Sequence, residues 1–137
     1  MIQYFTKKIN NKKGFTLVEL IIVVAILGVL SMLAVPRFTK SRKDAAIAVH
    51  DANVRTLESA ATLAKSEGKT VDWSDDNENW KDYLQDWPEV PKELEDEEDK
   101  NGNKVEGKYT VKENSEGKII VTPGRIKPKA SGEGEGN

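Results

Sequence analysis

Residues 15–35 read FTLVELIIVVAILGVLSMLAV, an apolar run with a single charged side chain, Glu19. As an α-helix with a rise of 1.5 Å per residue, these 21 residues are about 31 Å long, close to the roughly 30 Å hydrocarbon thickness of a bilayer. The run is therefore long enough to span a membrane. A secretory signal peptide needs small residues near its cleavage site, whereas Met32 and Leu33 lie there and Pro36 follows. We therefore expect the apolar run to be retained.

Outside this run the chain is polar and strongly charged. Of its 137 residues 37% are hydrophobic and 32% are charged, and the net charge is −2. Residues 71–106 carry 14 acidic and four basic side chains, which argues against a nucleic-acid groove there. The absence of cysteine excludes disulfides and thiolate zinc sites, and the single histidine, His50, disfavours a catalytic triad or a histidine metal site. We predict no enzyme activity and no cofactor, and expect His50 to be structural.

The helical period continues beyond Pro36, now with one apolar and one polar side. At 100° per residue, the following residues fall on the apolar side: Ala46, Val49, His50, Val54, Leu57, Ala60, Ala61 and Ala64. Gly68 is a typical helix stop, so residues 37–68 are predicted as an amphipathic stem. A helix from residue 15 to 67 would be about 80 Å long, more than the remaining chain can cover. About half of it must be buried in a bilayer or against other chains.

The chain after the stem breaks into short elements. Residues 69–123 are predicted to form a small head with a short helix at 77–86 and two strands at 105–113 and 118–122 that form a hairpin. Residues 124–137 are rich in glycine and charge and are expected to be disordered. The predicted fold class is α+β, a long N-terminal helical stem packed on a small antiparallel β-sheet.

One loop of the head has oxygen-bearing side chains at alternating positions. Asp99, Asn101, Asn103 and Glu106 surround Gly102 and are weak candidates for calcium ligands. Aligning Gly102 with the glycine of an EF-hand loop places a lysine where the bidentate glutamate belongs. Asn101-Gly102 is also a strong signal for a type I′ turn. We favour the turn and predict no metal site.

Three tryptophans, Trp73, Trp80 and Trp87, recur at intervals of seven residues. Trp80 and Trp87 would share one face of the predicted short helix. Large aromatic side chains in a small domain are used mainly for packing, so we expect them to pack against the stem. A carbohydrate-binding or partner-binding surface is the alternative.

The border between the basic leader and the apolar run carries a recognisable motif. Residues 12–20 read KKGFTLVEL, with Gly14 directly at the border. This sequence resembles a type IV prepilin, the precursor of a pilus subunit. The resemblance implies that a membrane peptidase removes the leader, residues 1–14, by cutting between Gly14 and Phe15 on the cytoplasmic face, and methylates the new N-terminus at Phe15. It also implies that Glu19 pairs with the Phe15 ammonium of a neighbouring subunit during assembly.

The resemblance, strongest over residues 8–36, implies a function and a set of partners. The chain would be a structural subunit that polymerises into a pilus, held in the cytoplasmic membrane before assembly and displayed on the cell surface afterwards. Its partners would be the lipid bilayer, the prepilin peptidase and methyltransferase, the assembly platform with its ATPase, and further copies of itself. Gly28 and Pro36 match small and helix-breaking positions of the family, so residues 28–36 are predicted to be the weakest part of the stem.

Two other functions stay open on the sequence. A pseudopilin of a type II secretion or competence system would carry the same leader. A single-pass membrane protein that never polymerises would carry the same apolar run.

Overall fold

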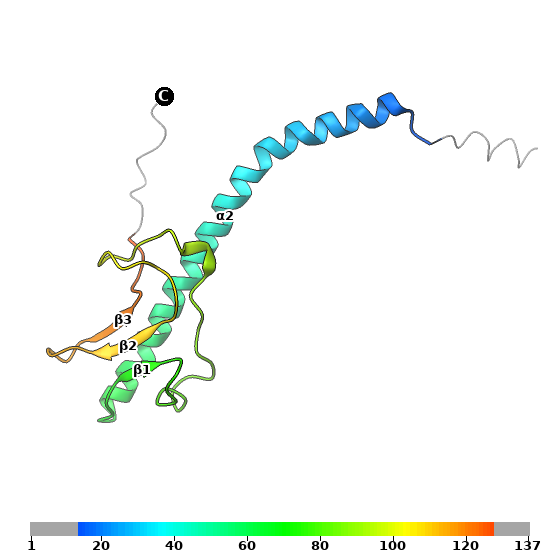
Figure 1. Ribbon diagram of the computed structural model, residues 1–137. Coiled ribbons are helices and arrows are strands. Elements are labelled where there is room, and N and C mark those ends of the chain that lie inside the picture. Colours follow the sequence, from blue (N-terminus) through cyan, green and yellow to red (C-terminus); the bar gives the residue numbers. More distant parts are fainter. Residues whose placement is uncertain (1–13, 128–137) are drawn as a thin grey trace, which may run out of the picture. The chain divides into compact units, whose positions relative to one another are not determined.

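The computed structural model describes residues 14–127 of the chain. Figure 1 shows the elements that these residues form: helix α2 (Leu17–Ser66), strands β1 (Asp72–Ser74), β2 (Thr110–Glu113) and β3 (Ile119–Thr122), and the short 3-10 helix η1 (Lys92–Leu94). The described chain divides after Lys40 into two compact units. We call residues 14–40 the N-terminal unit and residues 41–127 the globular unit. The predicted α+β architecture is confirmed.

Helix α2 ends at Ser66, and Gly68 forms its C-terminal cap. The amide of Lys69 donates to the carbonyl of Ala64 over 3.0 Å, and the amide of Gly68 donates to the carbonyl of Lys65 over 2.9 Å. This pair of bonds is the Schellman motif, which needs a left-handed residue directly after the helix. Gly68 has a φ of +76°, a conformation that costs glycine no steric strain.

The second half of α2 supplies one wall of the core of the globular unit. Seven of its eight predicted core positions are buried: Ala46, His50, Val54, Leu57, Ala60, Ala61 and Ala64. The prediction was wrong for Val49, which is 53% exposed. Val49 lies at the edge of the apolar arc, because at 100° per residue it is about 20° outside Ala60, the outermost buried position on that side.

The sheet faces the same core. Its strands are antiparallel in the order β1-β2-β3, and Trp73, Val111 and Val121 align across it. All three side chains are buried and belong to the core cluster that includes the α2 residues. The turn between β2 and β3 is closed by Asn114, whose side-chain oxygen accepts the amides of Glu116 and Lys118.

The strands differ from the predicted ranges. The predicted strand at 105–113 contracts to β2, because Gly107 adopts a φ of +76° and breaks the extended conformation before it. Val105 is fully buried, but its amide donates to the carbonyl of Glu97 rather than to the sheet. Strand β1 was not predicted, because its three residues are too few for an alternating pattern.

The helix predicted at residues 77–86 does not form. This segment consists of turns, with bonds from the amide of Lys81 to the carbonyl of Glu78 and from Tyr83 to Trp80. The Trp80 indole donates to the carbonyl of Ser74 over 3.0 Å and is itself buried. Burial of this side chain against β1 overrides the local helix signal, which asparagine and aspartate already weaken.

The tail is also shorter than predicted. Residues 124–127, assigned to a disordered tail, are described, and Ile126 is only 7% exposed within the core cluster. The rest of the predicted tail lies outside the described residues.

Candidate functional site

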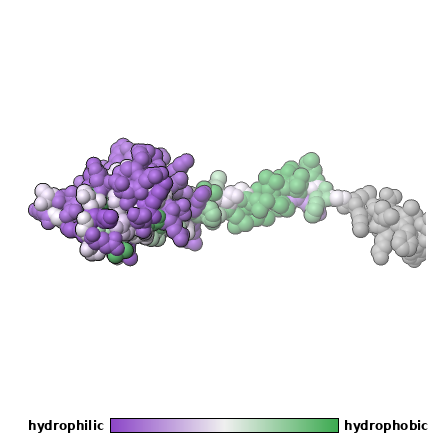
Figure 2. All heavy atoms as spheres, turned by 90° about the horizontal axis from the view of Figure 1, so that it is seen from below, coloured by the Kyte–Doolittle hydropathy of each residue, from purple (hydrophilic) through white to green (hydrophobic). Residues whose placement is uncertain are grey.

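The N-terminal unit exposes nearly all of its apolar surface. Sixteen large apolar side chains between Phe15 and Phe38 are each at least 47% exposed, and no described residue before Ala46 is buried. In Figure 2 the side chains of this unit form a continuous apolar surface, whereas those of the globular unit are mainly polar. Water is a poor solvent for such a surface, since each large apolar side chain gains about 1.5–3 kcal/mol on full burial.

The same segment meets the length and composition expected of a membrane span. Its most apolar 18-residue window, within α2, has a mean hydropathy of 2.8 and none of its residues is buried. The two hydroxyl side chains near its end are satisfied inside the helix: Ser31 donates to the carbonyl of Leu27 over 2.7 Å and Thr39 to that of Val35 over 3.1 Å. Such bonds remove the cost of placing a hydroxyl in an apolar medium.

Glu19 caps the start of α2, together with Thr16. The amide of Thr16 donates to the Glu19 carboxylate over 3.3 Å, and the amide of Glu19 donates to the Thr16 hydroxyl over 3.2 Å. This reciprocal pair is a capping box, which satisfies two amides that have no partner within the helix. Sequence reasoning missed it, although Thr16-x-x-Glu19 before an apolar run is its usual signal. The negative charge also lies at the positive end of the helix dipole.

The predicted cleavage site lies directly before this cap. Phe15 is 83% exposed, and no atom lies within 4 Å of the position that a Cβ would take on Gly14. Among the described residues, nothing therefore covers the backbone at Gly14. The leader before Gly14 lies outside the described residues.

Helix α2 continues through the stretch that the sequence marks as weak. Pro36 lies inside the helix, and the position of a Cβ on Gly28 is open. Proline removes the amide that would bond to the carbonyl of Met32, and glycine costs about 1 kcal/mol relative to alanine. Loss of helix between Gly28 and Pro36 during assembly stays a prediction.

The loop with candidate calcium ligands is organised by one buried carboxylate. Asp99 is 5% exposed and accepts the amides of Asn101, Asn103 and Gly124 at 2.7–2.9 Å, and the Asn103 side-chain amide at 3.0 Å. Burial alone would raise the pKa of Asp99, but the hydrogen bonds from Asn103, Gly124 and Asn101 outweigh it and lower the pKa. Both carboxylate oxygens thus serve N–H donors, which favours the turn over a metal site.

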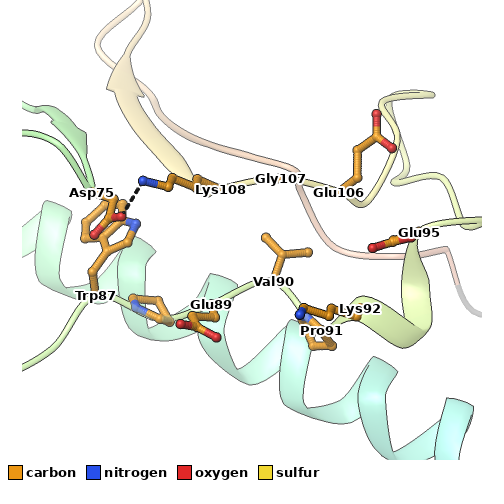
Figure 3. Close-up of a pocket in the computed structure, with 11 residues that line it drawn as sticks. Asp75, Trp87, Glu89, Val90, Pro91, Lys92, Glu95, Glu106, Gly107 and Lys108 are labelled. Atoms are coloured by element: carbon orange, nitrogen blue, oxygen red, sulfur yellow. Dashed lines mark ion pairs between the residues drawn. The ribbon is translucent and has the colours of Figure 1, made fainter.

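The loop turns one residue earlier than predicted. The amide of Gly102 donates to the carbonyl of Asp99 over 3.1 Å, so the central residues of this turn are Lys100 and Asn101, and Gly102, with a φ of +80°, ends it. Glu106 is exposed and lines a different hollow, shown in Figure 3. Among the residues that the structure describes, no three acidic or histidine side chains are grouped as metal ligands.

His50 joins the stem to the C-terminal segment. Its Nε2 lies 2.7 Å from the carbonyl of Gly124, which only accepts, so Nε2 donates there. Its Nδ1 then accepts the Tyr109 hydroxyl, also over 2.7 Å. Two carboxylates of the stem also bind this segment. Glu58 forms an ion pair with Arg125, and Asp51 accepts the amide of Ile126. Sequence reasoning missed this clamp, since it predicted the segment to be disordered.

The tryptophans are packing residues. Trp73 is 1% exposed and stacks on Tyr83, with ring centroids 5.5 Å apart. Trp80 is buried and its centroid lies 5.2 Å from that of Trp87. Trp80 and Trp87, which were predicted to share one face of a helix, therefore lie next to each other without a helix.

Part of the chain is similar to known proteins. Residues 9–35 match the prokaryotic N-terminal methylation motif. Two fimbrial proteins of Pseudomonas aeruginosa are each 40% identical over 60 residues, which are 44% of this chain and 39% of each relative. This chain therefore carries the methylation motif and is similar to part of these fimbrial proteins.

A third relative is similar over a stretch of the same length. The type IV narrow pilus major component PilA5 of Thermus thermophilus is 42% identical over 59 residues, 43% of this chain and 51% of the relative. The chain thus spans about half or less of the length of these curated relatives. No solved structure is significantly similar to the chain.

Proposed function

We propose that this chain is a pilin, a structural subunit that polymerises into a type IV pilus-like filament. Cleavage between Gly14 and Phe15, followed by N-methylation of Phe15, leaves an ammonium four residues before Glu19. The observation that carries the proposal is the exposed apolar surface of the N-terminal unit, with Glu19 as its one charge between Phe15 and Pro36.

The apolar surface requires two successive environments. Burying its sixteen large side chains is worth on the order of tens of kcal/mol, so the segment does not persist in water. A bilayer covers it before assembly, with the leader on the cytoplasmic side. Other copies of the same surface cover it in the filament, which is displayed at the cell surface.

Glu19 fixes the register of that assembly. In the isolated chain its carboxylate caps its own helix through Thr16. In the filament the Phe15 ammonium of a neighbouring copy approaches an apolar environment where a charge without a partner costs about 3–5 kcal/mol. Pairing with Glu19 removes that cost only in the correct register, so the pair selects against misplaced subunits.

The proposal places the remaining roles on other proteins. A prepilin peptidase and methyltransferase processes residues 14 and 15, and an assembly platform with an ATPase supplies the work of polymerisation. We expect no catalytic activity from the chain itself. The names of the relatives, fimbrial protein and pilus major component, favour a pilus over a secretion pseudopilin or a membrane protein that never assembles.

The test separates the charge of Glu19 from its capping role. Glu19→Gln keeps both bonds of the capping box, because glutamine accepts the Thr16 amide equally well, but removes the charge. We expect normal membrane insertion and at least about a hundredfold less filament, as expected for an ammonium left without a partner. Thr16→Val is the matched control, since it weakens the cap and keeps the charge, and it should retain filaments.

The measurement is the amount of filament sheared from cells, relative to the amount of processed chain in the membrane. Normal filament yield from Glu19→Gln would contradict the charge-pairing role. Equal loss from both variants would assign Glu19 to helix capping instead.

A further inference from the structure

The globular unit carries a hollow with an excess of negative charge. This acidic hollow has a volume of about 430 Å³, and its lining includes Trp87, two prolines and Val90. Its charged lining is four carboxylates, Asp75, Glu89, Glu95 and Glu106, and two lysines, Lys92 and Lys108, a net charge of −2. Figure 3 shows Asp75 and Lys108 paired, over 2.7 Å, which leaves three carboxylates of the lining without an ion pair within the described chain.

A second hollow of the globular unit has the opposite charge. This basic hollow has a volume of about 350 Å³ and is lined along β3 by Ile119 to Val121. Its charged lining is Lys100, Lys118, Arg125 and Glu58, a net charge of +2. Arg125 pairs with Glu58, whereas neither lysine has an ion-pair partner in the part of the chain that the structure describes.

The two hollows belong to different parts of the surface. They share no lining residue. In Figure 1, β3 lies at one edge of the globular unit, and the segment before η1, which lines the acidic hollow, lies at the other. A single copy therefore does not bring its own acidic and basic hollows together.

We propose that the basic hollow of one copy docks on the acidic hollow of the next copy in the filament. This inference rests on the proposed function, because it names the contact between globular units of a polymer. An open helical polymer needs a heterologous contact, in which two different surfaces of the same chain meet. Surfaces of charge +2 and −2 meet this requirement, since opposite charges attract across the contact while two equal hollows repel.

The charges set the orientation rather than most of the binding energy. Exposed ion pairs contribute little each, and salt screens them over about 8 Å at physiological ionic strength. The apolar stem holds the filament together, and the hollows select which edges of the globular units meet. The contact between globular units in the filament should therefore weaken as the ionic strength rises.

The test reverses the charge of each hollow alone and then the charges of both hollows together. Lys100→Glu with Lys118→Glu changes the basic hollow from +2 to −2, and Glu95→Lys with Glu106→Lys changes the acidic hollow from −2 to +2. Each pair alone should lower the filament yield from cells roughly threefold to tenfold at equal amounts of processed chain. All four substitutions in one chain restore opposite charges and should restore the yield.

The matched control is Lys69→Glu with Lys104→Glu. These exposed lysines line neither hollow, and their substitution changes the net charge by the same amount as reversal of the basic hollow. This control should assemble normally.

Three results overturn the inference. They are normal yield from both single-hollow reversals, loss that the fourfold variant does not restore, and an equal loss from the control. If the unaltered chain forms no filament, the proposed function fails first, and this inference fails with it. Filaments that assemble normally in every charge variant would leave the proposed function standing and remove the docking contact alone.

Discussion

Asp99 illustrates how one side chain organises a small unit without cysteines. Its carboxylate is buried and receives four N–H bonds, one of them from Gly124, 25 residues further along the chain. A Cβ added to Gly124 would lie 3.2 Å from an Asp99 oxygen, so the close approach favours glycine there. Sequence reasoning found Asp99 as an oxygen-rich loop residue and a weak candidate for a metal ligand, but it missed the donor from Gly124, because that bond depends on tertiary structure.

Replacement of Asp99 should destabilise the globular unit in a pH-dependent way. In Asp99→Asn an NH₂ group, which only donates, replaces one of the two carboxylate oxygens, which accept N–H bonds. This loss of an acceptor should lower the free energy of unfolding by about 1–3 kcal/mol at pH 7. The native state lowers the pKa of Asp99, so its stabilisation is complete above the ordinary value of 3.8 and is lost as the pH falls through the lowered pKa. The difference between variant and unaltered chain should therefore vanish in acid.

Chemical denaturation of the full chain in detergent micelles, followed by tryptophan fluorescence, measures this difference. Asp96→Asn, at an exposed position three residues away, is the control and should be neutral. A deficit for Asp99→Asn that persists unchanged in strong acid, below the lowered pKa, would contradict the account.

Calcium should have no effect on this loop. With both Asp99 oxygens taken by N–H donors, the loop offers calcium no free buried carboxylate among the described residues. We expect the melting temperature of the full chain in micelles to be the same with millimolar calcium and with chelator. An upward shift that Asp99→Asn abolishes would restore the calcium interpretation.

At the scale of elements, long periodic segments were predictable and short ones were not. Helix α2 consists of a long apolar run and a long amphipathic half, and a glycine follows its end, so its extent and its buried positions follow from the sequence. The exposure of Val49 does not. The segment around Trp80 carries an equally plausible local pattern over a much shorter stretch. There one buried indole and its bond to Ser74 decide the conformation.

The stretch between Gly28 and Pro36 should be the least protected part of the stem. Glycine costs about 1 kcal/mol and proline about 3 kcal/mol in a helix interior, and both lie close together in α2. Amide hydrogen exchange of the chain in micelles should therefore be faster here than between Leu17 and Leu27. Pro36→Ala should slow this exchange by restoring one amide and removing the clash with Met32. Uniform protection along the unaltered helix would contradict the prediction.

At the scale of the whole molecule, the two units answer different requirements. The N-terminal unit has an apolar surface that needs a bilayer or other copies. The sequence revealed it because fifteen large apolar side chains from Phe15 to Val35 follow one another with a single charge among them. The globular unit has a core of its own, which joins α2, the sheet and Ile126. Its long-range contacts, such as His50 with Gly124, join residues 74 positions apart and leave no local pattern in the sequence.

The mass of the chain recovered from filaments sheared off the cell surface tests the central claim most directly. We predict a major component that lacks residues 1–14, begins at Phe15 and carries one added methyl group. Absence of the chain from that fraction, or its presence there with the leader still attached, would contradict the account.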